Sequence, residues 1–472
     1  MTTIDPSIFK AYDIRATYPD KLNEDVIEDV IRAIYTYFTQ LKKKEHMTIV
    51  LGHDMRTHSL SLFQRAKNTL IQSGAHVIDV GLVPTPTVYF TTLQYQYDAG
   101  IMISASHNPK EYNGVKMALR DGTKMVKIGK TTGMLEIKEI AMNKKFPEYT
   151  NDGTVEEKKD VLKEEIAQAY KAIHPGDVSN LKIVADPANA MGILPLKELF
   201  DGTQYERVKT TFIPINFELD GTFPAHQADP LQHKTLRQLQ DTVIEEKADL
   251  GICTDGDADR VMFINEKGQI IPATYITALV ASEILKDFPG ERILVDIRYT
   301  RNVEHVVKQL GGEVGYTKVG HALITEQINK ENAVFAGESS GHYYFRETGG
   351  CESTMRIILY VLRVLGREKR PISEILQEME VSYESGEYNF ELPEGVTAQT
   401  ITEQITSAYR DGTLSTLDGI AIDYPDWRLS IRTSNTEPLL RLNIEGKTKE
   451  LVMAKVAELR HEIESTGAHI IE

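Results

Sequence analysis

The chain has 472 residues, of which 41% are hydrophobic and 26% are charged, an ordinary composition for a globular protein that is too long for one hydrophobic core. Its 53 Lys and Arg and 69 Asp and Glu side chains leave a formal net charge of −16, and such an acidic surface repels nucleic acid and anionic lipid. We therefore expect no nucleic-acid partner and no membrane partner, and any site for an anionic ligand has to gather its own Lys and Arg side chains.

Cysteine content and hydropathy indicate the compartment. Cys253 and Cys351 have no paired spacing, which excludes a disulfide scaffold and a zinc site built on cysteine pairs, and which suits a reducing environment. Residues 1–15 contain no apolar stretch long enough for a signal peptide, and the best candidate for a membrane span, 275–285, is interrupted by Glu283. We therefore expect a cytoplasmic protein.

Short runs rich in β-branched residues recur through the first three quarters of the chain. The predicted strands cover residues 47–52, 76–80, 99–104, 181–186, 249–254, 261–264, 293–297 and 333–337. Helical stretches such as 60–73 intervene, and this alternation is typical of βαβ units around a mostly parallel sheet. We expect three similar α/β layers in series.

The last part of the chain has a different pattern. Strands are predicted at 419–423, 428–432 and 439–445, and an amphipathic helix is predicted over 451–463, which together indicate a small α+β domain.

Three features mark the predicted domain boundaries: the polar stretch 143–159, the turn at Gly268, and the end of the helix that begins near Pro371. The predicted domains are residues 1–153, 154–268, 269–380 and 381–472. The predicted fold class is α/β, with three similar mixed-sheet α/β domains followed by a smaller α+β C-terminal domain.

The first segment that can carry chemistry is residues 103–109, Ile-Ser-Ala-Ser-His-Asn-Pro, at the end of a predicted strand. A Ser–Asn–Pro turn is also a common structural element. The G-x-S-x-G turn of hydrolases is absent, and His107 is too close in sequence to Ser106 to serve as the base of a triad. A hydroxyl beside a metal ion is well placed to carry phosphate, and Lys116 in the following strand brings a positive charge towards the same loop.

The second segment is Thr-Asp-Gly-Asp-Ala-Asp-Arg over residues 254–260, between two apolar strands. The carboxylates of Asp255, Asp257 and Asp259 repel one another within one loop, so a cation has to neutralise them, and all-oxygen ligands favour Mg²⁺ or Ca²⁺. An EF-hand is excluded because Arg260 stands where that motif needs glycine and because a strand follows at once. The alternative is a solvated acidic turn.

The third segment is Gly-Glu-Ser-Ser-Gly-His over residues 337–342. Its two glycines allow backbone to approach a ligand closely, and Glu338, Ser340 and His342 offer the acceptors and donors that sugar hydroxyls need. The alternative is a plain tight turn.

The fourth segment is Arg-Thr-Ser-Asn-Thr-Glu-Pro over residues 432–438. The Arg432 guanidinium, the hydroxyls of Ser434 and Thr436, the Asn435 amide and free backbone N–H groups form a site suited to a phosphate dianion. The alternative is a capping turn.

In this order and at these spacings, the four segments resemble the loops of the α-D-phosphohexomutase family, over essentially the whole chain. The resemblance implies four domains around a central cleft, with Ser106 as the phosphorylated residue. It implies that Mg²⁺ is held by the phosphorylated serine and the acidic loop, namely by Ser106, Asp255, Asp257 and Asp259. It implies sugar binding by Glu338 and Ser340 and phosphate binding by Arg432, Ser434, Asn435 and Thr436. It also places cationic or proton-transferring side chains at Arg15, Lys116, Arg260, His321 and His342.

The activity that the resemblance implies is interconversion of hexose 6-phosphate and hexose 1-phosphate. Phosphoserine and a hexose 1,6-bisphosphate, which also serves as activator, are the expected intermediates, and His321 and Lys116 are the expected candidates for proton transfer. Residues 223–226 and the last loop look most like those of bacterial members acting on mannose phosphates, with glucose as a further substrate. Small-molecule sugar phosphates are thus the expected partners of a monomer or homodimer.

Two other functions remain open from the sequence. One is a metal-dependent sugar phosphatase or bisphosphate synthase that uses the same phosphoserine. The other is a sugar-phosphate-binding regulator without turnover, for which neither Ser106 nor the acidic trio would be needed.

Overall fold

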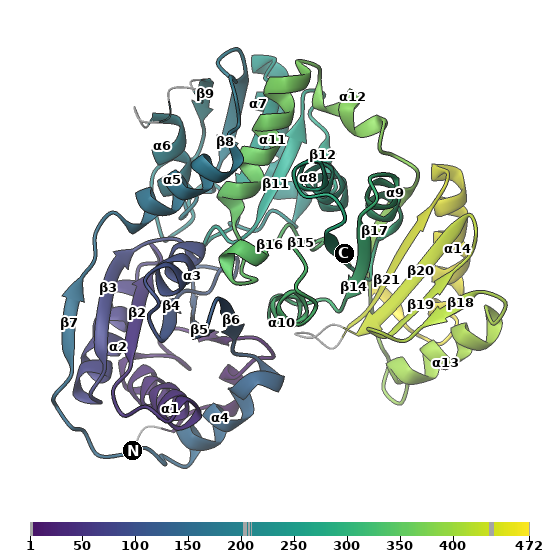
Figure 1. The fold of residues 1–472 in the computed structure, drawn as a ribbon. Helices are drawn as coiled ribbons and strands as arrows, with labels where there is room; N and C mark the ends of the chain where they lie inside the picture. The colour runs from purple at the N-terminus through teal and green to yellow at the C-terminus, as the bar shows by residue number, and fades with distance from the viewer. Residues whose placement is uncertain (1–2, 202–204, 206–207, 209, 434–438, 472) are drawn as a thin grey trace.

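The computed structural model describes residues 3–201, 205, 208, 210–433 and 439–471. In this part of the chain four β-sheets follow one another, each with its own helices, and Figure 1 shows them as successive units from the purple N-terminal to the yellow C-terminal end. Among the helices described, none has the length and apolar character needed to cross a membrane.

The first unit contains a seven-stranded mixed sheet in the order β1-β5-β4-β2-β3-β7, with β6 paired to β5. Its strands are β1 (Ile14–Thr17), β2 (Thr48–His53), β3 (His76–Leu82), β4 (Ala99–Ile103), β5 (Tyr112–Asp121), β6 (Lys124–Lys127) and β7 (Thr154–Glu157). Its helices are α1 (Glu24–Lys42), α2 (Ser59–Gln72), α3 (Thr85–Gln94) and α4 (Leu135–Met142). The strands β4, β2, β3 and β7 are parallel, whereas β5 runs antiparallel to β4.

The second unit has a five-stranded sheet in the order β12-β11-β10-β8-β9, in which β8, β9 and β10 are parallel. Its strands are β8 (Lys182–Asp186), β9 (Thr211–Pro214), β10 (Leu250–Thr254), β11 (Val261–Asn265) and β12 (Ile270–Ile271). Its helices are α5 (Val161–Ile173), α6 (Ile193–Asp201) and α7 (Arg237–Glu246).

The third unit has a four-stranded sheet in the order β14-β13-β15-β16, in which only β16 is antiparallel to its neighbour. Its strands are β13 (Arg292–Asp296), β14 (Glu313–Thr317), β15 (Phe335–Gly337) and β16 (Tyr343–Phe345). Its helices are α8 (Ala273–Asp287), α9 (Arg301–Gln309), α10 (His321–Glu331), α11 (Thr354–Glu368) and α12 (Ile372–Gln377).

The fourth unit is an antiparallel sheet in the order β18-β19-β20-β21-β17-β22. Its strands are β17 (Tyr383–Glu391), β18 (Thr413–Ser415), β19 (Ile420–Asp423), β20 (Trp427–Thr433), β21 (Leu439–Gly446) and β22 (His469–Ile471), and its helices are α13 (Ala398–Ala408) and α14 (Lys449–Glu464). Alternation along β20 gives this sheet two faces: Leu429 and Ile431 join the core with the helices, whereas Arg428 and Arg432 leave the opposite face. The predicted multi-domain α/β architecture is confirmed.

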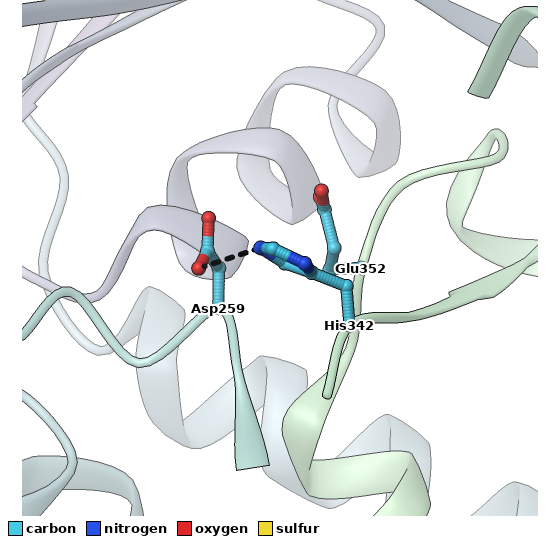
Figure 2. A group of neighbouring side chains, drawn as sticks. All are labelled: Asp259, His342 and Glu352. Carbon is cyan, nitrogen blue, oxygen red and sulfur yellow. Dashed lines mark ion pairs between the residues drawn. The ribbon is translucent and has the colours of Figure 1, made fainter. Parts of the chain in front are cut away.

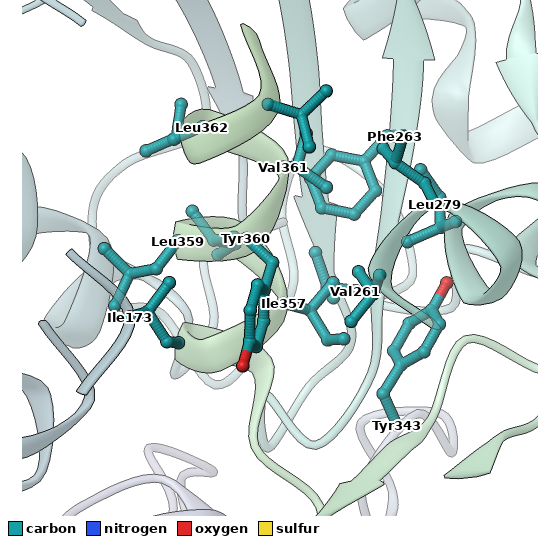
Figure 3. Packing of buried hydrophobic residues seen from close by; sticks show 14 of the residues in the cluster. Ile173, Val261, Phe263, Leu279, Tyr343, Ile357, Leu359, Tyr360, Val361 and Leu362 are labelled. Atoms are coloured by element: carbon teal, nitrogen blue, oxygen red, sulfur yellow. The ribbon is translucent and has the colours of Figure 1, made fainter. Parts of the chain in front are cut away.

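The largest hydrophobic core is shared by the second and third units. It runs without interruption from α5 through β11 and α8 to α11, and α11 packs against both α5 and α8. Figure 3 shows Ile173 of α5, Phe263 of β11, Leu279 of α8 and Tyr343 of β16 around α11. The first and fourth units have cores of their own.

The same strand pair recurs in the first three units, and it positions the predicted loops. In each unit a buried parallel strand is followed directly by an antiparallel neighbour, as β4 by β5, β10 by β11 and β15 by β16. The predicted serine, acidic and sugar-binding loops are the turns of these three pairs. Ligand sites in α/β sheets lie beyond the carboxyl ends of parallel strands, so the repeated pair presents all three loops at equivalent edges.

Candidate active site

The serine loop is buried and held in an unusual backbone conformation. Ser106 has a φ of 50°, in the left-handed region, and its backbone N–H donates to the Ser104 hydroxyl oxygen at 2.9 Å. Its own hydroxyl donates to Asp255 Oδ2 at 2.7 Å and lies 3.1 Å from His107 Nδ1. The predicted serine therefore contacts the predicted acidic loop directly.

Arg56, at the end of the first turn after β2, holds the serine loop in place. Its guanidinium donates to the carbonyl oxygens of Ser106 at 2.7 Å, Asn108 at 2.6 Å, Pro109 at 2.7 Å and Tyr112 at 3.0 Å. The arginine is fully enclosed, and its Nε lies 3.3 Å from Asp54 Oδ2. One planar group thus fixes four carbonyls of one turn.

Replacing Arg56 with lysine is expected to lower the free energy of unfolding by about 1–3 kcal/mol, because an ammonium cannot reach four carbonyls and leaves buried acceptors unpaired. Urea unfolding measures the loss, and amide exchange over residues 104–111 is expected to accelerate. The matched control is Arg65→Lys, whose side chain is 43% exposed and pairs with Glu28, and which should change stability by less than about 0.5 kcal/mol. If both variants had the same free energy of unfolding and the same rate of amide exchange, Arg56 would not hold the serine loop in place.

A glycine lets the acidic loop reach the serine loop. A Cβ added at Gly256 would lie 2.1 Å from the carbonyl oxygen of Ser106, far inside contact distance. Any other residue at position 256 would push the two loops apart.

Asp255, Asp257 and Asp259 lie together at the carboxyl end of β10 and are all buried. Lys116 of β5 donates to Asp257 Oδ2 and to Asp259 Oδ2, both at 2.6 Å. Although burial opposes it, these two carboxylates raise the pKa of Lys116 above its usual range. Burial, with repulsion from Asp259 and Asp257, raises the pKa of Asp255 well above its usual range, so this carboxyl favours its protonated form unless a further positive charge lies beside it.

The acidic trio has the chemistry of a site for a divalent cation. Asp257 Oδ1 is buried without a hydrogen-bond partner among the described residues, and Asp259 Oδ1 is contacted there by the His342 ring at 3.3 Å. One oxygen from each of the three carboxylates lies within 4.8 Å of the other two, and the Ser106 hydroxyl contacts the group. Oxygen donors of this kind fit Mg²⁺ or Ca²⁺.

His342 joins the acidic loop to the sugar-binding loop. Its Nε2 lies 3.3 Å from Asp259 Oδ1 and its Nδ1 lies 2.9 Å from Glu338 Oε2. Although burial opposes it, Asp259 raises the pKa of His342 to about 9, so the imidazole carries a charge between two carboxylates. Arg260 Nε lies 3.1 Å away from His342 Nε2, so a second positive charge faces the trio from the side of its own loop.

Figure 2 shows a further carboxylate near His342, that of Glu352, with the imidazole ring between Glu352 and Asp259. Glu352 forms a buried ion pair with Lys127 of β6, which joins the third unit to the first. The negative charge of Glu352 is therefore matched by Lys127 within the protein.

His321 begins α10 and points into the same region. Its ring packs edge-on against Tyr12 at 5.4 Å between centroids and lies 6.4 Å from the ring of His342. Burial and then Lys127 lower the pKa of His321 well below its usual range. Its Nε2 is buried without a hydrogen-bond partner among the described residues, so a neutral imidazole with a free nitrogen is available to a ligand.

The sugar-binding loop is tied to the fourth unit through Arg298. Glu338 accepts a hydrogen bond from Tyr344 at 2.9 Å and lies 3.5 Å from Arg298 Nη2, and Ser340 Oγ lies 2.8 Å from His342 Nδ1. Arg298 Nη1 in turn lies 3.8 Å from Glu387 Oε2 in β17. A continuous series of polar contacts therefore leads from the serine to the last unit.

Arg432 stands at the end of this series, 3.0 Å from Glu387 Oε2, and is 2% exposed. Ser434, Asn435 and Thr436 of the predicted phosphate-binding loop lie outside the described residues.

Arg15 contacts the serine loop from β1. It donates to Asn108 of that loop at 2.5 Å and to Asp13 at 2.7 Å.

The structure thus brings the described candidate residues of all four segments into one connected site. Sequence reasoning assigned no role to Arg56, Arg298, Glu387, Lys127 or Glu352. A signal was present for the first two, because each arginine follows an aspartate by two residues at the end of a predicted strand. No local pattern marks the other three.

The chain matches a known family along nearly its whole length. Four domain descriptions of phosphoglucomutase/phosphomannomutase match it in order: α/β/α domain I over 6–146, domain II over 162–268, domain III over 272–383 and the C-terminal domain over 387–462. A phosphomannomutase of Vibrio cholerae is 34% identical over 456 residues, which cover 96% of this chain and 97% of the relative. A phosphomannomutase of Methanocaldococcus jannaschii is 33% identical over 472 residues, covering 99% of both chains.

Solved structures show the same arrangement. A phosphoglucomutase/phosphomannomutase family protein from Burkholderia thailandensis superposes with a TM-score of 0.87 at 26% identity, covering 99% of this chain and 100% of the other. Aspergillus fumigatus N-acetylphosphoglucosamine mutase in complex with GlcNAc-6P and magnesium shares the fold, with a TM-score of 0.61 at 13% identity over 98% of this chain and 96% of that one.

Proposed function

The chain belongs to the phosphoglucomutase/phosphomannomutase family, and from this premise we propose that it is a phosphomannomutase that interconverts the 1- and 6-phosphates of mannose. Phosphate is carried on Ser106. The observation that supports this proposal most directly is the Ser106 hydroxyl, 2.7 Å from Asp255 within a buried acidic trio. Curated relatives named phosphomannomutase support mannose, and glucose phosphate is proposed as a second substrate because the sugars differ only at C2.

In the proposed reaction, a hydroxyl of the hexose monophosphate attacks the phosphorus of phospho-Ser106. The bond between phosphorus and the serine oxygen breaks, the hydroxyl proton passes to the base, and the product is a hexose 1,6-bisphosphate. The bisphosphate turns over in the site, its other phosphate returns to Ser106, and the proton returns to the oxygen left behind. Hexose 1,6-bisphosphate also activates the enzyme by phosphorylating Ser106.

Each residue then has a definite proposed task. Asp255, Asp257 and Asp259, with the serine, hold Mg²⁺, which when bound supplies positive charge against the transferring phosphoryl group. Lys116 places a further positive charge, its ammonium group, beside the carboxylate oxygens of Asp257 and Asp259. His321 accepts the proton, because its buried Nε2 has no partner among the described residues, whereas Lys116 is engaged by two carboxylates.

The sugar and its second phosphate are bound by the third and fourth units. Glu338 and Ser340 contact sugar hydroxyls, with Arg260, Arg15 and His342 adding positive charge around the cleaved bond. Arg432 with Ser434, Asn435 and Thr436 grips the phosphate that is not transferred. The monomeric or homodimeric state, the cytoplasmic location and the absence of nucleic-acid and membrane partners stay predictions from the sequence.

The decisive experiment follows mannose 1-phosphate by phosphorus NMR with Mg²⁺ and a trace of mannose 1,6-bisphosphate. We expect mannose 6-phosphate to accumulate to equilibrium without release of inorganic phosphate, and glucose 1-phosphate to react no faster. Release of inorganic phosphate as the main product would show that the protein is a phosphatase and not a mutase. Tight binding with no new phosphorus signal would identify a binding protein.

A further inference from the structure

Two arginines of the fourth unit face each other across neighbouring strands. Arg432 of β20 and Arg441 of β21 are cross-strand partners in the antiparallel register. Their side chains therefore leave the same face of the sheet, where like charges directly opposite each other destabilise the strand pair. A negative charge is needed beside them.

Glu387 of β17 supplies this negative charge. Its Oε2 lies 3.0 Å from Arg432 Nη2, and its Oε1 lies 3.3 Å from Arg441 Nη1. The pairing of β17 with β21 shifts register between Glu384 and Glu387, an irregularity of the kind that re-aims a side chain in a strand. After the shift Glu387 pairs with Asn443, two residues from Arg441 and hence on the same face.

A third arginine, Arg298 of the third unit, also contacts Glu387. Arg298 Nη1 lies 3.8 Å from Glu387 Oε2, while its Nε and Nη2 donate to Asp296 at 3.0 Å each. The Arg298 side chain also borders Glu338 of the sugar-binding loop at 3.5 Å. Guanidinium groups from two units therefore converge on one carboxylate beside the proposed sugar site.

The cluster keeps donors for a further anion. Asp296 and Glu338 also contact Arg298, and Glu387 is the carboxylate that all three guanidinium groups share. Arg432 Nε is buried and has no hydrogen-bond partner among the described residues. An unpaired buried donor is costly, and a phosphate oxygen satisfies it well.

We propose that Glu387 is a positioning residue that gathers Arg298, Arg432 and Arg441 into a preformed receptor for the untransferred phosphate dianion of the substrate. This inference deepens the proposed function and rests on it. Without the carboxylate the three guanidinium groups would repel one another, and the substrate would have to assemble them on binding.

The test compares Glu387→Gln with Glu387→Asp and with the double variant Glu387→Gln/Arg441→Gln. The control is Glu391→Gln in the same strand, at a side chain that is 58% exposed. We expect Glu387→Gln to raise KM for mannose 1-phosphate about tenfold with kcat changed less than about twofold, because binding is lost equally from ground and transition states. Glu387→Asp should recover part of the loss, since it restores the charge, whereas the double variant also loses a phosphate-binding arginine and should have a KM at least as high as that of Glu387→Gln.

Calorimetric binding of mannose 6-phosphate separates this inference from the proposed function. If the wild type neither binds nor turns over sugar phosphate, the proposed function has failed. If the wild type binds and the glutamine variant binds equally well, the positioning role is wrong. A lower KM in the glutamine variant would show that Glu387 competes with phosphate, and a loss of thermal stability with unchanged KM would show a structural role only. Should Glu387→Gln not fold, the same comparison of KM and affinity is made with Glu387→Asp.

Discussion

Turnover of mannose 1-phosphate is expected to fall by at least about a thousandfold when Ser106 is replaced by alanine, because the transferred phosphate loses the oxygen that carries it. The side chain is buried and its oxygen lies 2.7 Å from Asp255, at the acidic trio where the transferred phosphate is proposed to lie. The coupled assay that follows formation of mannose 6-phosphate measures the effect.

The serine variant should stay folded, which makes the loss of activity interpretable. Ser106 has a φ of 50°, and alanine meets the same backbone strain as serine there, so the thermal midpoint is expected to change little. The matched control is Ser179→Ala, an exposed serine in the loop before β8. Turnover within tenfold of wild type in the Ser106 variant, or phosphate found on another residue by mass spectrometry, would reject Ser106 as the carrier.

Removal of divalent metal is expected to lower turnover by about a thousandfold, since a metal ion contributes several kcal/mol to stabilising the charge of a transferring phosphoryl group. Without a metal ion, Lys116, Arg260 and His342 would have to offset the charge of the three aspartates and of the dianionic phosphate on the serine. Dialysis against a chelator, elemental analysis and readdition of Mg²⁺ or Ca²⁺ test the expectation.

We expect one metal ion for each chain before chelation, recovery with Mg²⁺ and weaker recovery with Ca²⁺, whose longer bonds suit a looser site. Asp257→Asn removes one ligand charge and should raise the Mg²⁺ concentration needed for half-maximal turnover. Full activity in protein shown by elemental analysis to be metal-free would contradict the assignment of the acidic trio.

Local patterns predict the elements of the fold closely. Each predicted strand is a short run that is either apolar throughout, with both faces buried, or alternates apolar and polar residues, with one face buried. The predicted strand 249–254 is β10 (Leu250–Thr254), and the predicted helix 451–463 lies within α14 (Lys449–Glu464). The position of Ser106, Asp255 and Glu338 after predicted strands also followed from sequence alone.

What the sequence could not predict is interaction between distant segments. Strand order, the joint core of the second and third units and the contact of Arg56 with four carbonyls depend on tertiary packing. Glu387 is marked by no motif, since its role arises from a register shift in β17 and from arginines of two other strands and another unit. The predicted domain boundaries stay predictions.

The hydrophobic core shared by the second and third units determines which parts of the protein unfold together. Helix α11 of the third unit supplies Ile357 and Leu359 to a cluster that also contains Ile173 and Phe263 of the second, so neither sheet keeps its apolar side covered if the chain is severed between them. Calorimetric melting should therefore resolve a middle block that unfolds as one cooperative body, flanked by two end blocks that are free to melt on their own. A truncated protein that lacks the fourth unit retains an intact interior, whereas a fragment ending near Ile271 would aggregate through exposed leucine and isoleucine side chains.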